Sequence, residues 1–263
     1  MLVKHAVEQK TRKQWIEASR FHDLDDRQVL DHVLESVRKG PPGGQVLLDL
    51  DSTLYEVGHR TYQILKEWRE SRDAQGYPRI HAALQGLRLD HVGYSLKDTF
   101  QALGFALDDP EILAMHRQAK GFWTSRFFSS EYLKFDRPYS GASDFVRDLH
   151  RAGAAIVYLT GRDEEGMGRG TREILARDGF PVGERIDYVL KPTRLGDDHE
   201  HKVVSSRKLR ERGPILASFE NEPRNLMSIA RELPGATHVF VETHCSDHPA
   251  DPADGIYRIR GYL

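Results

Sequence analysis

The ten residues 45–54, QVLLDLDSTL, suggest how the rest of the chain folds. Their apolar start predicts a buried strand, and the strand runs directly into two carboxylates, Asp49 and Asp51, which one residue separates. Ser52 and Thr53 add two hydroxyl groups. Like charges this close repel each other, and the pKa of one carboxyl rises unless a cation neutralises the pair. The pattern therefore indicates a chemical site at the end of a strand.

Four further apolar runs follow, with helical patterns between them. The apolar runs cover residues 154–159, 186–190, 214–219 and 237–241, and the helical patterns cover residues 141–152, 171–178, 202–212 and 225–233. Continuous apolar strands that alternate with helices predict an α/β fold with a Rossmann-like parallel sheet and helices on both faces. In such sheets ligands bind at the carboxyl ends of the strands.

Residues 57–135 interrupt this alternation, because they hold aromatic-rich helical patterns and no comparable strand. We expect them to form a helical cap inserted after the first strand, with residues 41–56 and 136–263 forming the α/β core. Residues 1–40 predict an N-terminal helical segment packed on that core. Its helix should cover residues 11–39, with Asp25 or Asp26 at its start and the Gly/Pro run 40–44 beyond its end.

Composition excludes several classes of protein. The 263 residues include 38 basic and 40 acidic side chains, so a net charge near −2 gives no general attraction to nucleic acid or to an anionic membrane. Cys245 is the single cysteine, which rules out an intramolecular disulfide and favours a reducing compartment. The first residues lack the apolar segment of a secretory signal, and no run approaches the ~20 apolar residues of a membrane helix. We therefore expect a cytoplasmic protein.

Polar residues follow four of the predicted strands, and they should meet at one edge of the sheet. They are Asp49 and Asp51 after the first strand, Thr160 and Gly161 after the second, Lys191 after the third, and Glu220 and Glu222 after the fourth. Carboxylates, a hydroxyl and a lysine suit a divalent cation together with a phosphate. Mg²⁺ prefers a near-octahedral set of oxygens, which the side chains of Asp49 and Glu220 and the backbone carbonyl of Asp51 could supply.

The same residues could carry out a reaction. A carboxylate such as Asp49 can attack phosphorus to give an aspartyl-phosphate, which divides a difficult hydrolysis into two easier steps. Asp51 could protonate the leaving oxygen and then deprotonate the attacking water. The Thr160 hydroxyl and the Gly161 N–H could hold phosphoryl oxygens, and a lysine would offset the charge of the transferred group.

The stretches DLDSTL and VYLTGRD, a lysine and the acidic stretch FENEPRNL occur in an order that resembles the haloacid dehalogenase-like (HAD) hydrolases. The resemblance spans about residues 45–245, and the insert matches the cap of that family. It implies that Asp49 is the nucleophile, that Asp51 is the general acid/base and that Thr160 binds phosphate. Because the dehalogenases usually lack the second aspartate, Asp51 indicates phosphoryl rather than carbon chemistry.

Two assignments from the resemblance stay open. The phosphate-binding lysine is Lys202 or Lys191, and Lys202 is favoured because it opens the helix before the fourth strand. Glu220 stands where many relatives have aspartate, and Glu222 is a candidate second metal ligand, as are Asn221 and Asn225.

The resemblance implies a Mg²⁺-dependent phosphatase that hydrolyses a small phosphomonoester. The alternatives are a nucleotide or nucleic-acid-end phosphatase, a catalytically silent phosphate-binding or scaffold protein, and a phosphotransferase with an acceptor other than water.

Four other patterns have simpler interpretations. An EF-hand beginning at Asp49 would need glycine and glutamate where Leu54 and Arg60 stand. We interpret the glycine-rich residues 166–170 as a flexible loop before a helix that starts near Thr171, and residues 197–201 as a polar loop. The fifth strand is followed by Thr243, His244 and Ser246. These residues would lie at the edge of the site only if the end of that strand reaches it.

Overall fold

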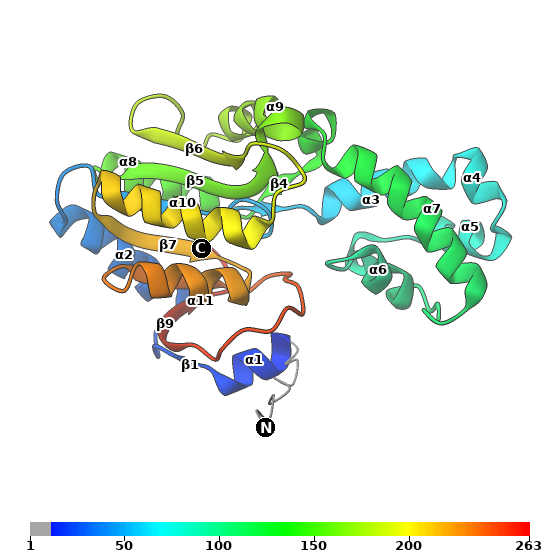
Figure 1. Cartoon of the computed structure of the whole chain (residues 1–263), viewed down its shortest axis with the longest axis horizontal. Helices are drawn as coiled ribbons and strands as arrows, with labels where there is room; N and C mark the ends of the chain where they lie inside the picture. The colour runs from blue at the N-terminus through cyan, green and yellow to red at the C-terminus, as the bar shows by residue number, and fades with distance from the viewer. Residues whose placement is uncertain (1–11) are drawn as a thin grey trace, which may run out of the picture.

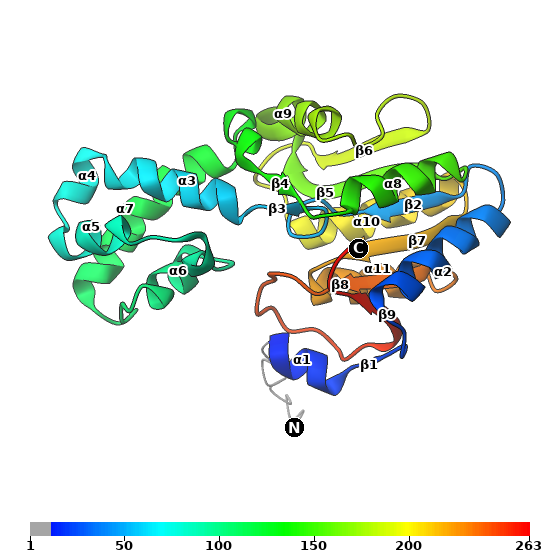
Figure 2. The same cartoon turned by 180° about the vertical axis from the view of Figure 1, so that it is seen from behind.

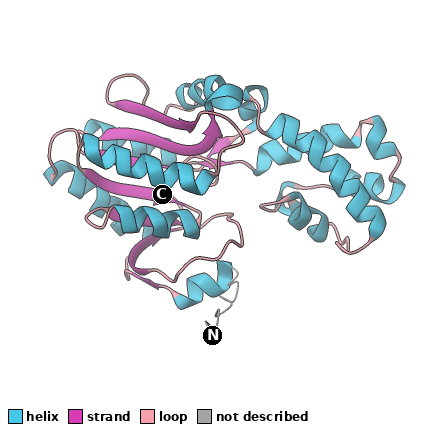
Figure 3. Ribbon diagram, viewed as in Figure 1, coloured by secondary structure: helices cyan, strands magenta, loops and turns pink. Residues whose placement is uncertain are grey.

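The computed structural model describes residues 12–263, and within them seven parallel strands form the central sheet (Figures 1 and 3). The strand order is β1-β9-β8-β7-β2-β5-β6. The strands are β1 (Arg20–Phe21), β2 (Gln45–Leu48), β5 (Ala155–Asp163), β6 (Ile186–Lys191), β7 (Ile215–Glu220), β8 (Thr237–Val241) and β9 (Asp254–Ile259). The fold class predicted from the sequence is thus observed, and β2 lies between β5 and β7 at the centre of the sheet.

Helices cover both faces of the sheet, as Figures 1 and 2 show from opposite sides. One face carries α2 (Asp26–Lys39) and α8 (Ala142–Arg151), and the other carries α10 (Asp198–Arg212) and α11 (Pro223–Glu232). Val46 and Leu48 of β2 belong to the apolar core under α2 and α8, whereas Leu47 belongs to the core under α10 and α11. A strand buried on both faces explains why residues 45–48 are continuously apolar.

The N-terminal segment is not one long helix, which corrects the prediction for residues 11–39; residues 1–11 lie outside the described part. It forms α1 (Arg12–Ala18), the short strand β1 and then α2, whose start is capped by Asp25. The strand β1 pairs with β9 at the edge of the sheet. Two residues are too few to show an alternating pattern, and β9 carries polar residues that an edge region tolerates, so both strands escaped the sequence analysis.

Residues 57–135 form a helical insert with its own apolar core. The insert contains α3 (Gly58–Arg69), α4 (Arg72–Gln75), α5 (Pro78–Gln85), η1 (Leu89–His91), α6 (Leu96–Ala102), α7 (Pro110–Phe127) and η2 (Ser130–Phe135). Trp68, Phe100 and Met115 are buried together at the centre of this core. The chain enters and leaves through a two-stranded antiparallel ribbon of β3 (Tyr55–Glu56) and β4 (Arg137–Pro138). No helix within residues 12–263 is long and apolar enough to cross a membrane.

The glycine-rich residues 166–170 are helical rather than a loop, because α9 spans Glu164–Arg177 with Asp163 as its N-cap. The glycines allow α9 to approach the end of the insert closely. A Cβ added at Gly170 would lie 2.7 Å from the carbonyl oxygen of Ser130. The Ser130 hydroxyl donates to the Gly166 carbonyl at 2.9 Å and accepts from the Gly170 N–H at 3.0 Å. Close packing therefore outweighs the low helix propensity of glycine.

The polar residues 197–201 also form part of a helix rather than a loop. Asp197 is the N-cap of α10, and its side chain accepts from the Glu200 N–H at 2.8 Å. A carboxylate cap followed by acidic residues in the first turn is typical of a helix start. The negative charges interact favourably with the positive end of the helix dipole and stabilise α10.

Candidate active site

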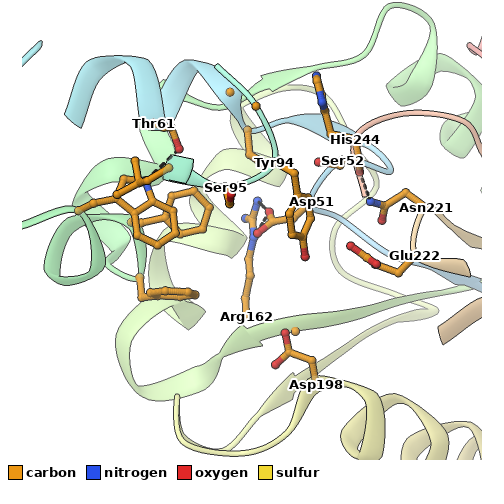
Figure 4. Close-up of a pocket in the computed structure, with 18 of the residues that line it drawn as sticks. Asp51, Ser52, Thr61, Tyr94, Ser95, Arg162, Asp198, Asn221, Glu222 and His244 are labelled. Carbon is orange, nitrogen blue, oxygen red and sulfur yellow. Dashed lines mark hydrogen bonds and ion pairs between the residues drawn. The ribbon is translucent and has the colours of Figure 1, made fainter. Parts of the chain in front are cut away.

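A cavity of about 360 Å³ lies between the carboxyl edge of the sheet and the helical insert. Figure 4 shows Asp51, Arg162 and Glu222 from the α/β core beside Tyr94 and Ser95 from the insert. Of the eight residues predicted for the site, six line this cavity: Asp49, Asp51, Thr160, Gly161, Lys202 and Glu222. Lys191 and Glu220 lie outside the lining.

The loop after β2 holds the two aspartates in place. The Asp49 N–H donates to the Phe219 carbonyl of the neighbouring strand β7 at 3.1 Å, which continues the sheet up to this residue. The chain then turns sharply, and Ser52 adopts a left-handed conformation with φ of 60°. A non-glycine residue in this region is strained, and such strain is concentrated at functional sites. The Thr243 hydroxyl stabilises the turn by donating to the Ser52 carbonyl.

Asp49 is held between a lysine and a hydroxyl. Lys202 of α10 donates from Nζ to Asp49 Oδ1 at 2.7 Å and to Glu220 Oε2 at 2.6 Å. The Thr53 hydroxyl donates to Asp49 Oδ2 at 2.9 Å. Asp49 is buried but reaches the cavity, whereas Glu220 lies behind it and is only 1% exposed. The structure therefore brings Lys202, and not Lys191, to the predicted nucleophile.

Burial and neighbouring charges shift the pKa values of Lys202, Asp49 and Glu220, and for Lys202 the two effects have opposite signs. Burial disfavours the ammonium of Lys202, but the carboxylates of Asp49 and Glu220 outweigh it and raise its pKa. Burial raises the pKa of Asp49 above its ordinary value, although Lys202 opposes that effect. Burial also raises the pKa of Glu220, to about 8, because Asp49 adds to the effect and Lys202 only partly offsets it. The single ammonium of Lys202 thus forms ion pairs with two carboxylates. If Glu220 were protonated, Lys202 would form its ion pair with Asp49 alone.

Asp51 belongs to a cluster of four charged side chains, the Arg60/Asp136 cluster, which comprises Asp51, Arg60, Asp136 and Arg162. Arg60 binds Asp136 through two hydrogen bonds of 2.8 and 2.6 Å. Arg162 donates to Asp136 at 2.9 Å and from Nε to Asp51 at 2.9 Å. The side chains of Arg60, Asp136 and Arg162 are at most 1% exposed, whereas that of Asp51 is 32% exposed at the cavity. Asp51 is therefore the end of the cluster that a ligand reaches.

The two arginines set the charge of Asp51. Burial alone would raise the pKa of Asp51, but Arg162 and then Arg60 outweigh it, and the net effect lowers the pKa. Asp51 is consequently a carboxylate at neutral pH, which suits a group that accepts a proton from water. To act as an acid it would first have to take up a proton against this field.

Arg60 and Asp136 belong to the site although no sequence pattern predicted them there. Arg60 had a recognisable signal, because it lies at helical spacing with Ile64 and Trp68, and all three are fully buried. An arginine on the apolar face of a helix needs a buried partner. The partner lies 76 residues further along the chain, which no local pattern reveals.

The remaining predicted phosphate ligands separate into two places. Thr160 is buried at the cavity wall, and its Oγ1 accepts from the Arg162 N–H at 3.2 Å. Gly161 lines the cavity, and a Cβ there would lie 2.7 Å from Asp198 Oδ2, so a side chain would crowd this loop. Lys191 is outside the cavity lining, and it donates to the Gly196 carbonyl at 2.9 Å and to Asp198, a residue of the lining.

The oxygens at the core end of the cavity fit a hard cation. Within residues 12–263 no three His, Cys, Asp or Glu side chains are grouped closely enough to hold a metal. However, the Thr53 hydroxyl lies 2.9 Å from Asp49 Oδ2 and 3.0 Å from Asn221 Oδ1. One hydroxyl proton can serve only one of them at a time, so two converging oxygens share a single donor. A carboxylate oxygen and an amide oxygen are ligands of the kind that Mg²⁺ binds.

The acidic residues after β7 take different positions. Glu222 lines the cavity, and its carboxylate accepts from the Ser246 N–H at 2.9 Å and from the Ser246 hydroxyl at 2.6 Å. Glu220 was predicted as a metal ligand, but its oxygens face Lys202 and the Glu222 N–H rather than the cavity. Asn221, which donates to the His244 carbonyl at 2.6 Å, takes the place at the cavity that the prediction gave to Glu220.

Comparison with known proteins places the chain by its fold. A protein from Clostridium difficile, provisionally described as a phosphatase, matches with a TM-score of 0.51 and 15% identity over 84% of this chain and 96% of that one. A predicted phosphoglycolate phosphatase from Haemophilus somnus has a TM-score of 0.49 and 13% identity, covering 85% and 96% of the two chains. A protein from Bacteroides fragilis, provisionally described as a haloacid dehalogenase-like hydrolase, has a TM-score of 0.45 and 14% identity, covering 82% and 96%.

No family model and no curated protein matches the sequence. The match with the Clostridium difficile protein confirms the predicted fold class. The resemblance to the haloacid dehalogenase-like hydrolases rests on the motifs at the strand ends and stays a prediction.

Proposed function

We propose that the chain is a Mg²⁺-dependent phosphatase that hydrolyses a small phosphomonoester through an aspartyl-phosphate. The observation that carries this proposal is the position of Asp49. Its carboxylate reaches a cavity, is held by Lys202 and Thr53, and has a second carboxylate two residues away. A fixed nucleophile with a neighbouring proton acceptor is the arrangement that covalent hydrolysis requires.

The proposed reaction has two steps. An Asp49 oxygen forms a bond to phosphorus while the ester oxygen departs with the bonding electrons and takes up a proton from Asp51, which has gained that proton from solvent beforehand. Water then attacks the phosphorus of the aspartyl-phosphate, Asp51 accepts the proton of that water, and the Asp49 carboxylate is released together with phosphate. Because Arg162 and Arg60 lower the pKa of Asp51, its carboxylate is ionised and can accept this proton.

The surrounding residues would bind the phosphoryl group. The Thr160 hydroxyl and the Gly161 N–H lie at the cavity wall, and the Lys202 ammonium would offset negative charge beside Asp49. Asp49, the Asp51 backbone and Asn221, with Glu222 nearby, would hold Mg²⁺. The ion would neutralise the carboxylates and polarise the phosphoryl oxygens. The helical insert would act as a cap that excludes bulk water and selects the substrate.

The test is phosphate release from a panel of phosphomonoesters, with Mg²⁺ or with EDTA. We expect metal-dependent release by the wild type and a loss of at least about a thousandfold in Asp49→Asn, because the nucleophile is removed. Asp23→Asn, at an exposed position, is the matched control and should behave as the wild type. Release that Asp49→Asn retains, or that EDTA does not affect, would contradict the proposal.

A further inference from the structure

The two ends of the cavity carry opposite charge. At the core end, the cavity is lined by the four carboxylates of Asp49, Asp51, Asp198 and Glu222, which outnumber the two cations there, Arg162 and Lys202. At the end formed by the insert, it is lined by three basic side chains: Lys97 of α6, and His116 and Lys120 of α7. The proposed reaction uses the core end and leaves these three side chains without a role.

The basic side chains at the insert end lie close to one another. His116 packs its edge on Phe100, with ring centroids 6.2 Å apart. Burial lowers the pKa of His116, and the positive charges of Lys120 and Lys97 lower it further, so both lysines act on the same ring. Three basic groups from two helices thus converge on one part of the cavity.

Within the part of the chain that the structure describes, Lys97 and Lys120 have no protein partner. Among residues 12–263, neither Lys97 nor Lys120 makes an ion pair or a hydrogen bond. The lysines near the core end differ, because Lys202 binds Asp49 and Glu220, and Lys191 binds Asp198. Two neighbouring cations without a counter-charge repel each other, and an anionic ligand would relieve that repulsion.

An aromatic wall joins the two ends of the cavity. It consists of Trp123, Phe127 and Phe128. The rings of Trp123 and Phe127 stack with centroids 4.2 Å apart, and the Arg60 guanidinium lies 4.2 Å from the centroid of Phe127 on the core side. The Trp123 indole N–H donates to the Thr61 hydroxyl at 3.0 Å, which fixes the orientation of the ring. The middle of a ligand would therefore contact rigid apolar surface.

We infer that the substrate carries a second anionic group, which Lys97 and Lys120 bind at the insert end while its phosphate occupies the core end. The part of the substrate between its two charges is flat or apolar and packs on the aromatic wall. A cavity of about 360 Å³ suits a small molecule that has a phosphate at one end and a second anionic group at the other. The inference rests on the proposed function for the orientation of the phosphate, and it adds the class of substrate.

Binding of two non-hydrolysable analogues tests the inference independently of turnover. Benzylphosphonate and 4-carboxybenzylphosphonate differ only in the second anion, and titration calorimetry with Mg²⁺ gives the dissociation constant of each. We expect the carboxylated analogue to bind the wild type about tenfold more tightly, because charge-assisted hydrogen bonds contribute that much. In the double variant Lys97→Met/Lys120→Met this ratio should fall to about one.

Lys66→Met is the matched control, because Lys66 belongs to the same insert but lies outside the cavity lining, and it should keep the ratio of the wild type. The inference is overturned if neither analogue binds, if the wild type shows no preference, or if the double variant keeps it. Release of phosphate from phenyl phosphate and 4-carboxyphenyl phosphate is measured on the same preparations. Preferential binding without release would contradict the proposed function alone, and release without preference would contradict this inference alone.

Discussion

Asp136 illustrates how one residue can connect the insert to the site. It receives two hydrogen bonds from Arg60 of α3 and one from Arg162 of β5, and its side chain is fully buried. It also stands beside the ribbon strand β4, through which the chain leaves the insert. The carboxylate therefore binds both arginines at the point where the insert and the α/β core meet, and Asp51 supplies the second negative charge.

We expect Asp136→Asn to lower the free energy of unfolding by about 3 kcal/mol, because it leaves buried arginine charge uncompensated. Urea denaturation followed by circular dichroism measures this change. The matched control is Asp148→Asn, since Asp148 pairs with Arg151 at 3.2 Å on the surface and its side chain is 53% exposed. The control should change stability by less than about 0.5 kcal/mol. Equal effects of the two substitutions would show that the buried cluster does not stabilise the fold.

At the scale of elements, α2 shows how a surface helix is fixed on the sheet. Val29, Val33 and Val37 recur at helical spacing and are buried under it, as the sequence pattern predicts. The Asp25 side chain accepts from the Gln28 N–H at 2.8 Å, and the Gln28 side chain accepts from the Asp25 N–H at 3.0 Å. This reciprocal pair satisfies two N–H groups that the first turn would otherwise leave free.

Replacing the cap should destabilise the protein by a small and predictable amount. We expect Asp25→Ala to cost about 1 kcal/mol of unfolding free energy, and Asp25→Ser to recover most of it because serine also caps helices. Thermal or urea denaturation measures both variants. Asp31→Ala, on the exposed face of the same helix, is the control for loss of an acidic side chain. A loss in Asp25→Ser as large as that in Asp25→Ala would mean that the capping bond is not the cause.

At the scale of the whole molecule, stability depends on protons as well as on packing. His238 lies in β8, where its Nε2 donates to the Leu233 carbonyl at 2.9 Å and its Nδ1 accepts from the Ser218 hydroxyl at 2.7 Å. Burial lowers the pKa of His238 below its ordinary value of 6.5, and the Leu233 carbonyl opposes this only in part. The folded protein thus holds this ring neutral in a range where the unfolded chain protonates it.

The sign of the pH effect follows from this difference. Above pH 6.5 neither state binds the proton, so the contribution of His238 to stability is fully present. As the pH falls below 6.5, the unfolded state gains the proton first, and stability should decrease by up to about 1.4 kcal/mol per pH unit until the folded pKa is reached. Urea denaturation between pH 5 and 7.5 should show a steeper loss for the wild type than for His238→Gln.

Comparing the wild type with His238→Gln isolates the contribution of His238 to the pH dependence of stability. The other groups with shifted pKa values, which include Glu220, are the same in both and cancel in the difference. Parallel stability curves for the wild type and His238→Gln across this pH range would refute the prediction.

The sequence by itself determined the α/β architecture and the edge of the sheet that carries the carboxylates. Strands buried on both faces must be continuously apolar, and the polar residues that follow them lie at their carboxyl ends. Residues 45–51 therefore predict both a central strand and the position of Asp49 and Asp51. The helical character of residues 57–135 was also predictable, because amphipathic periodicity is a local property.

Only the tertiary structure decided which distant side chains meet. Two lysines had suitable positions in the sequence, but packing of α10 directs Lys202 to Asp49, while Lys191 turns to Asp198. Asp51 and Arg162 are 111 residues apart, and Arg60 and Asp136 are 76 residues apart. Such contacts depend on how elements pack, and periodicity within one element carries no information about them. The positive charge at the insert end of the cavity was also not predictable from local patterns, because Lys97 and Lys120 come together only when α6 packs against α7.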